Sequence, residues 1–192
     1  KDFMKNAVGF TYSGVEYVFE DSEKTPGSNI IVTGYRGTGT NVRIPEKIDG
    51  YVVSVIKAGA FKGNGKIRRL KLECNAVIGK EAFAGCTALT SVEVTGEGEI
   101  TPDVSAFGYC PRLKSVKIYK QINYSQSVSI FTGDRAVEEL YLRNYDGENC
   151  GRIAWLFGVE MLSDSALKNL TVGKVGEIGE SFCYNFVNLE SV

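Results

Sequence analysis

A repeat of apolar residues at unequal spacing constrains this chain more than any other feature. In four segments a phenylalanine is followed by apolar residues six, nine and eleven positions later, and the phenylalanines lie 22, 24 and 24 residues apart. This spacing is typical of neither a single helix nor a single strand, and a fixed period in this range predicts a stack of similar coils. The four sets are Phe61, Ile67, Leu70 and Leu72; Phe83, Leu89, Val92 and Val94; Phe107, Leu113, Val116 and Ile118; and Phe131, Val137, Leu140 and Leu142.

Isoleucines eleven residues upstream extend the pattern. Ile56 precedes Ile67, and Ile78 precedes Leu89, each by eleven positions. Pro102 occupies the isoleucine place of a later repeat, and Gln126 occupies that of the next one, so we expect those coils to be irregular. Two degraded repeats follow, one with Met161 in the phenylalanine place and one formed by Ile178, Leu189 and Val192. The count is therefore about six coils over 53–192, the last one without a cap.

Residues 1–52 lack the repeat and are predicted to form an N-terminal β cap. Val15 to Glu20, Ile30 to Gly34 and Asn41 to Pro45 are β-rich runs separated by turn residues. The first coil of a solenoid has no neighbour on one side, so its apolar face and its strand edge need a cover. The same argument applies at Val192, where we expect either further chain in the natural protein or a partner that pairs with the open edge.

The last two apolar residues of each repeat alternate with polar neighbours, which is the period-two pattern of a strand with one buried face. Stacked repeats would place these strands in one parallel sheet. The "AFxGC" part is too short for a regular helix and is interpreted as a short helical turn on the opposite face, with Gly63, Gly85 and Gly133 relieving backbone strain. The predicted class is therefore α/β but β-rich: a solenoid with a parallel sheet on one face and short helical turns on the other.

The amino-acid sequence of the repeat resembles that of a known family. "VIGKEAFAGCTALTSVEV", "VSVIKAGAFKGN" and "VRIPEKIDGYVVSVI" are similar to the BspA-like leucine-rich repeats of bacterial surface proteins, over 42–118 clearly, 120–142 moderately and 153–192 weakly. The resemblance implies a leucine-rich repeat solenoid that is extracellular, displayed at the cell surface, and active in adhesion or ligand binding rather than catalysis. The proline that follows the strand in this family is retained only as Pro45. The family has no fixed binding residues to transfer.

Composition excludes several functions. With 22 Lys+Arg, 23 Asp+Glu and a formal net charge of −1, the chain lacks the basic runs interleaved with aromatic residues that nucleic-acid binding needs. No apolar stretch is long enough for membrane insertion, and we expect any signal peptide or anchor to lie outside this sequence. It has no histidine, which removes Ser-His-Asp, Cys-His and histidine-based metal sites. We therefore expect no enzyme activity, no catalytic residues, no metal and no cofactor; "DGEN" at 146–149 has oxygen ligands but lacks the spacing of an EF-hand loop.

Five cysteines leave at least one unpaired. Cys86 and Cys110 share a repeat position and would lie about 4.8 Å apart on neighbouring coils, a spacing that allows a disulfide. The favoured interpretation is a column of small buried apolar residues.

The outward residues of the predicted sheet are the candidate recognition surface. One row contains Lys71, Glu93 and Lys117, whose alternating signs predict ion pairs that set the coil register. Farther along, aromatic and cationic residues of the type that dominates binding hot spots are expected to gather. The candidate binding residues are Lys117, Tyr119, Tyr141, Arg143, Tyr145 and Trp155, although Trp155 could instead fold inward beside Leu156. The insertion between Leu142 and Leu156 could carry binding or be idle.

Two functional hypotheses follow. The first is a binding or adhesion module that recognises a host or extracellular protein or glycan through the solenoid face. The second is a structural spacer that holds other domains away from the cell surface. A saturable ligand distinguishes the first from the second.

Overall fold

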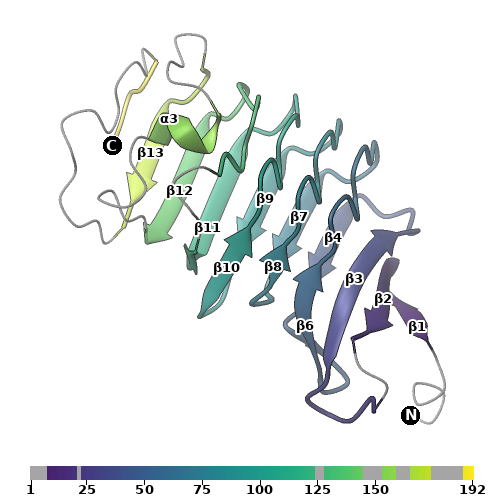
Figure 1. Ribbon diagram of the computed structural model, residues 1–192. Coiled ribbons are helices and arrows are strands. Elements are labelled where there is room, and N and C mark those ends of the chain that lie inside the picture. Colours follow the sequence, from purple (N-terminus) through teal and green to yellow (C-terminus); the bar gives the residue numbers. More distant parts are fainter. Residues whose placement is uncertain (1–7, 21–22, 124–127, 145–152, 159–164, 174–187) are drawn as a thin grey trace.

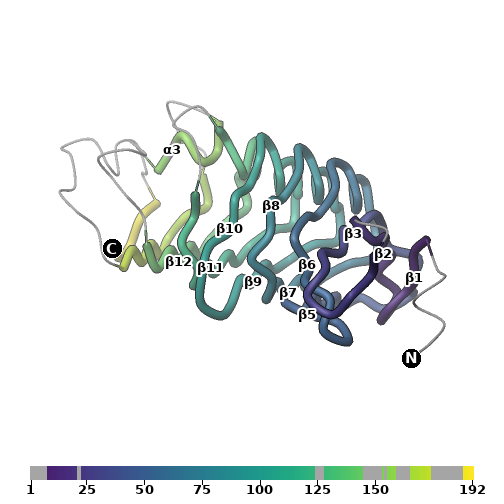
Figure 2. Tube along the Cα trace, turned by 60° about the horizontal axis from the view of Figure 1, so that its bottom comes forward, coloured from purple at the N-terminus to yellow at the C-terminus, as the bar shows by residue number. Residues whose placement is uncertain are grey.

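Two β-sheets, joined where Glu99 and Ile100 pair with Gln121 and Ile122, face each other across a single apolar core in the computed structural model (Figure 1). The structure describes residues 8–20, 23–123, 128–144, 153–158, 165–173 and 188–192. The path of the chain is a coil that alternates between the two sheets (Figure 2). Sheet A contains, in spatial order, β1 (Gly9–Tyr12), β2 (Val15–Phe19), β3 (Asn29–Tyr35), β6 (Tyr51–Ile56), β8 (Val77–Ile78) and β10 (Glu99–Pro102). Sheet B contains β4 (Asn41–Ile44), β7 (Arg69–Leu72), β9 (Ser91–Val94), β11 (Ser115–Ile122), β12 (Glu139–Asn144) and β13 (Asn169–Val172).

Sheet B is the predicted parallel sheet, and its register follows the repeat. Leu70 lies opposite Val92, and Val92 lies opposite Val116. Leu140 continues the same row to β13. The apolar positions of these strands are buried and their neighbours face outward, so the period-two pattern indicated the buried face correctly.

Sheet A is a second parallel sheet along the isoleucine column, which the sequence pattern did not indicate as strand. Ile56 pairs with Ile78, and Ile78 pairs with Pro102. The expected irregularity at Pro102 is wrong, because the hydrogen bonds of β10 to its neighbour come from the N–H groups of Thr101 and Asp103. Proline therefore removes no bond to β8 at this position. Gln126 lies outside the described residues.

The prediction of short helical turns opposite sheet B is not supported for the stacked coils. Gly59 and Gly63 both have a positive φ, at 66° and 72°, which breaks the right-handed path that a helix needs. Successive N–H groups also alternate in their partners: Ala60 bonds within its coil to Lys57, whereas Phe61 bonds to Ala82 of the next coil. These segments are turns that are hydrogen-bonded to the turns of the neighbouring coils. In the described part of the chain the helical segment is α3 (Ile153–Leu156), which has four residues.

Phenylalanines from these turns form a ladder through the core. The rings of Phe61 and Phe83 are 4.7 Å apart between centroids, those of Phe83 and Phe107 are 5.2 Å apart, and those of Phe107 and Phe131 are 5.7 Å apart. The four side chains are at most 2% exposed. Because each ring packs on the ring of the next coil, the repeat length itself keeps the coils in register.

The N-terminal strands extend sheet A. β1, β2 and β3 pair antiparallel, β3 then pairs in parallel with β6, and the short β5 (Lys47–Ile48) also pairs with β6. β4 instead pairs in parallel with β7, placing Asn41 opposite Arg69. The first strand of sheet B thus comes from the 1–52 segment for which the sequence predicts a cap. The described residues include no helix that is both long and apolar enough to cross a membrane.

Candidate functional site

The outer face of sheet B presents two rows of side chains that run across the strands. β4, β7, β9, β11, β12 and β13 contribute one residue each to both rows. The first row is Asn41, Arg69, Ser91, Ser115, Glu139 and Asn169. The second row is Arg43, Lys71, Glu93, Lys117, Tyr141 and Thr171.

Two of the predicted binding residues contact each other on this face. The rings of Tyr119 in β11 and Tyr141 in β12 are 4.8 Å apart between centroids and tilted by 37°. Both side chains are half-buried and polar at the tip. Such a pair presents a large, rigid contact surface that loses little conformational entropy on binding.

Lys117 lies beside this pair and is held by its own network. Its Nζ is 2.9 Å from Oε1 of Glu139, and the hydroxyl of Ser115 donates to Oε2 of Glu139 at 2.8 Å. The hydrogen bond from Lys117 is the main cause that lowers the pKa of the Glu139 carboxyl, and it raises the pKa of Lys117 in turn. The Glu139 carboxylate is therefore ionised at neutral pH, and its two oxygens are bound by Lys117 and Ser115.

Arg143 lies at the end of β12 and reaches back toward an earlier coil. Its Nη1 is 3.4 Å from Oε1 of Glu97, and both side chains are largely in solvent, with the glutamate 89% exposed. Because exposed pairs of this kind contribute little, the guanidinium can exchange Glu97 for a ligand at small cost. Tyr119, Tyr141 and Arg143 thus share one region of the outer face.

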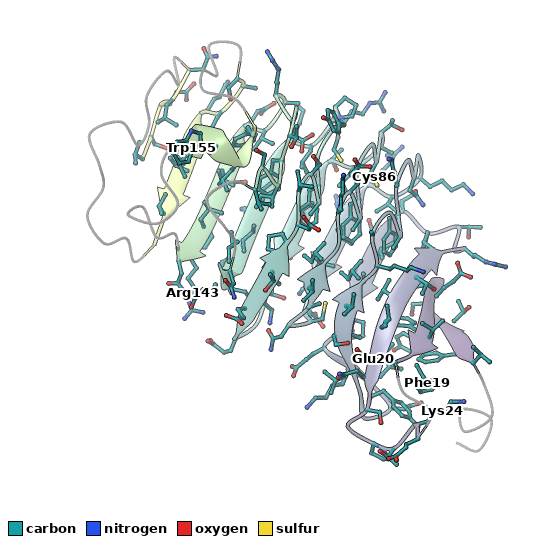
Figure 3. The ribbon with its side chains drawn as sticks, viewed as in Figure 1. Phe19, Glu20, Lys24, Cys86, Arg143 and Trp155 are labelled. Carbon is teal, nitrogen blue, oxygen red and sulfur yellow. The ribbon has the colours of Figure 1, made fainter. Side chains whose placement is uncertain are left out.

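The other predicted members do not join this region. Trp155 lies in α3, at the opposite edge of the solenoid from Arg143 (Figure 3), and remains 39% exposed rather than folding inward beside the buried Leu156. Tyr145 and the "DGEN" segment of the insertion lie outside the described residues.

The predicted row of alternating charges is in register but does not form the predicted ion pairs. Lys71 and Lys117 both lie opposite Glu93, yet Lys71 is 3.6 Å from Glu73, and Lys117 binds Glu139. Glu93 has no ion pair among the residues that the structure describes. A lysine can reach diagonally as easily as across, so the register did not decide its partner.

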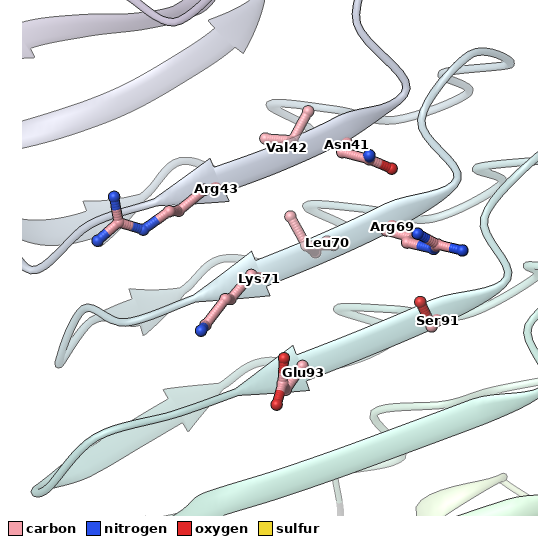
Figure 4. Close-up of a pocket in the computed structure, with 8 residues that line it drawn as sticks. All are labelled: Asn41, Val42, Arg43, Arg69, Leu70, Lys71, Ser91 and Glu93. Atoms are coloured by element: carbon pink, nitrogen blue, oxygen red, sulfur yellow. The ribbon is translucent and has the colours of Figure 1, made fainter.

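A groove of about 320 Å³ lies at the first three strands of the outer face (Figure 4). The outward residues that line it are Asn41, Arg43, Arg69, Lys71, Ser91 and Glu93, and the buried Val42 and Leu70 belong to the same strands. Arg43 is held by Glu73 through two bonds of 2.9 and 2.7 Å. The sequence-based candidate site did not include Arg43, because β4 was not recognised as the first strand of sheet B. It did not include Arg69 either, which lies on a predicted strand but outside the aromatic and cationic group expected at the later coils.

A buried lysine holds the turns beneath the outer face. Lys120 is 2% exposed, and its Nζ donates to Oδ1 of Asn75 and to the carbonyl of Glu97, both at 2.6 Å. The amine thus connects three successive coils. Lys120 is structural, because each N–H group that donates to the turns is unavailable to a ligand.

The three cysteines in the described part of the chain pack in the core. Cys74, Cys86 and Cys110 are free and buried, so the favoured interpretation of stacked apolar thiols is confirmed for Cys86 and Cys110. The Cys86 thiol donates to the carbonyl of Phe61 at 3.3 Å, and Cys110 donates to Phe83 at 3.4 Å. Burial raises the pKa of the Cys74 thiol to about 12. The Cys74 thiol is therefore protonated at neutral pH, whereas nucleophilic chemistry needs the thiolate.

Asp134 takes the cysteine place in the next coil. Its side chain is 1% exposed, Oδ1 accepts the N–H of Cys110 at 2.5 Å, and Oδ2 has no partner in the described structure. Burial is the main cause that raises the pKa of this carboxyl to about 9. The carboxyl is enclosed within the core and faces no cleft, so its perturbed pKa reflects packing. In the described part of the chain, no group of three or more histidine, cysteine or carboxylate side chains is placed to hold a metal.

Solved structures with this architecture come from bacteria. The leucine-rich repeat protein TpLRR of T. pallidum is 21% identical, with 88% of this chain and 84% of that chain covered and a TM-score of 0.52. A leucine-rich cell surface protein of Faecalibacterium prausnitzii is 16% identical, with 87% of this chain and 43% of that chain covered and a TM-score of 0.52. At these identities the likeness concerns the fold alone. A comparison with curated protein sequences gives no match.

The family follows from the repeat sequence itself. The family model described as BspA type leucine rich repeat region matches residues 38–144 in six copies, which is more than half of the 192 residues. The match includes β4 and ends at Asn144, the last residue of β12. The chain therefore belongs to the BspA type leucine-rich repeat family.

Proposed function

We propose that this chain is a cell-surface binding module that recognises an extracellular or host protein or glycan through the outer face of sheet B. The observation that carries the proposal is the contact between Tyr119 and Tyr141, with Arg143 at the end of the same strand. Tyrosine and arginine are enriched where binding energy concentrates. The pair lies outside the core, which contains its own aromatic ladder, and both rings remain partly exposed on the sheet face.

Surface display is part of the proposal. The family is of the bacterial leucine-rich repeat type, and the related F. prausnitzii structure is described as a cell surface protein. Repeat scaffolds of this kind present an extended face on rigid strands, which suits recognition better than catalysis.

A binding screen tests the proposal. The purified chain is applied to immobilised extracellular matrix proteins and glycans beside a Tyr141→Ala/Arg143→Ala variant and a Lys47→Ala/Lys80→Ala control. Lys47 and Lys80 are exposed and lie outside sheet B, so the control should retain its signal. A saturable signal that only the tyrosine and arginine variant loses supports the module. No binding signal from any member of the panel would support the rival hypothesis of a structural spacer.

A further inference from the structure

The groove at β4, β7 and β9 contains two charged side chains that have no ionic partner. Arg69 and Glu93 are both without an ion pair among the described residues, although Arg43 and Lys71 beside them share Glu73. In Figure 4, Asn41, Arg69 and Ser91 form one row of the groove, and Arg43, Lys71 and Glu93 form the other. A ligand between the rows would meet a free guanidinium, a free carboxylate, an amide and a hydroxyl.

The electrostatic environment of this groove is positive. Residues 57–72 form one coil and contain six basic side chains and no acidic one, although the whole chain has a formal net charge of −1. Two of the six are paired, Lys62 with Glu81 and Lys71 with Glu73. The remaining four, Lys57, Lys66, Arg68 and Arg69, are exposed and have no ion pair in the described structure. Such a field concentrates anions near the groove.

The walls of the groove argue against a peptide. β7 and β9 each pair with a strand on both sides. β4 has a free edge, but this edge lies on the side away from β7, so a peptide that added to it would lie beside the groove and not in it. All outward lining residues are polar or charged, and Val42 and Leu70 are buried. A peptide site normally offers an apolar pocket for an anchor side chain, and none is present here.

We infer that this groove is a binding subsite for a carboxylated sugar. Arg69, with its rigid fork of donors, suits the carboxylate. Glu93, Ser91 and Asn41 accept from or donate to hydroxyl groups, and the aliphatic stems of Arg43 and Lys71 provide contact for the C–H face of a ring. A volume of about 320 Å³ is at the small end of ligand sites and matches one or two sugar rings. The carboxylate can belong to a terminal sialic acid or to a uronic acid within a chain.

Calorimetric titration of the whole 192-residue chain tests the inference. The two acidic probes are sialyllactose and trigalacturonic acid, and their neutral counterparts are lactose and the methyl ester of the trigalacturonate. We expect saturable binding of at least one acid, at least about tenfold weaker binding of its neutral counterpart, and a loss of about tenfold or more with Arg69→Gln. The acid that binds identifies the source of the carboxylate.

Arg112→Gln is the matched control, because Arg112 is an exposed arginine of a later coil that does not line the groove. It removes the same charge and should leave the affinity within about twofold. Equal losses in both variants would mean attraction by the overall field and would overturn the inference. Equal binding of the acid and its neutral counterpart would also overturn it, as would tighter binding of a hexaglutamate peptide or no binding of either acid.

The inference rests on the proposed function only in using the same outer face. Tyr141 and Arg143 do not line the groove, so the Tyr141→Ala/Arg143→Ala variant should bind the acidic sugar with unchanged affinity. A loss of sugar binding in that variant, with Arg69→Gln unaffected, would support the outer face as a binding surface and refute the groove.

Discussion

Replacing Asp134 with asparagine should remove most of the pH dependence of stability between pH 5.5 and 7.5. Asp134 is 1% exposed, and burial raises its pKa to about 9, whereas an aspartate in an unfolded chain titrates near 3.9. Between these two values the folded state binds one proton more than the unfolded state. The contribution of Asp134 to the free energy of unfolding is therefore fully present below about pH 4. Above that pH it falls by about 1.4 kcal/mol for each pH unit.

The size of the effect can be stated because little else titrates in that window. The chain has no histidine. The carboxyls whose pKa is lowered by ion pairs, such as Glu73 beside Arg43, are ionised in both states above about pH 5.5. From pH 5.5 to 7.5 the unaltered protein should lose about 2.7 kcal/mol of unfolding free energy through Asp134 alone.

Asparagine is the informative replacement because its Oδ1 can still accept the N–H of Cys110, which Asp134 now binds at 2.5 Å. Urea unfolding followed by circular dichroism at pH 5.5, 6.5 and 7.5 gives the slope for each protein. Asp134→Asn should show a nearly flat profile, and Asp49→Asn, which alters an exposed carboxyl, should keep the original slope. Parallel slopes in Asp134→Asn and the unaltered chain would refute the assignment of a neutral buried carboxyl.

Three further predictions concern the core. Lys120→Met should cost about 1–3 kcal/mol in urea unfolding, because it leaves the Glu97 carbonyl without the amine, whereas the exposed Lys66→Met should change stability by less than about 0.5 kcal/mol. Phe107→Ala should cost about 3–5 kcal/mol, since it opens a gap in the middle of the ring ladder, and a loss below about 1 kcal/mol would mean that the rings do not hold the coils together. In a Cys150→Ser/Cys183→Ser variant, a colorimetric thiol reagent at pH 8 should detect no thiol in the folded protein and three in urea, and rapid labelling of the folded state would contradict the burial of Cys74, Cys86 and Cys110.

The repeat spacing was sufficient to predict sheet B from β7 onward, because each of these strands carries two apolar residues in alternation and so shows the period directly. β4 lies before the first phenylalanine repeat and was assigned to the cap. The parallel part of sheet A was missed because β8 has only two residues, too few for a period to appear. The turns were assigned as helical because the left-handed conformation was anticipated only at glycines. Glu81, Ser105 and Tyr109 also adopt the left-handed conformation, at φ of 55°, 53° and 59°. Their residue types do not predict this conformation.

The candidate site could be predicted only in part. Tyr119 and Tyr141 come together because neighbouring coils place their strands side by side, which the spacing already implies. Trp155 could not be located, since it follows an insertion that interrupts the repeat. Ion-pair partners such as Glu139 for Lys117 depend on side-chain reach and not on register.

The most direct test of the central claim is to block one face at a time and measure ligand capture. In the Cys150→Ser/Cys183→Ser background, a single cysteine is introduced at Thr171, exposed on the outer face of sheet B beside Tyr141, or at Val77, exposed on sheet A. Each is coupled to a bulky maleimide polymer, and capture by the matrix-protein and glycan panel is compared with that of the uncoupled protein. We expect the polymer at Thr171→Cys to abolish capture and the polymer at Val77→Cys to leave capture intact. Undiminished capture with the outer face of sheet B blocked, or a loss only when sheet A is blocked, would contradict binding through the outer face of sheet B.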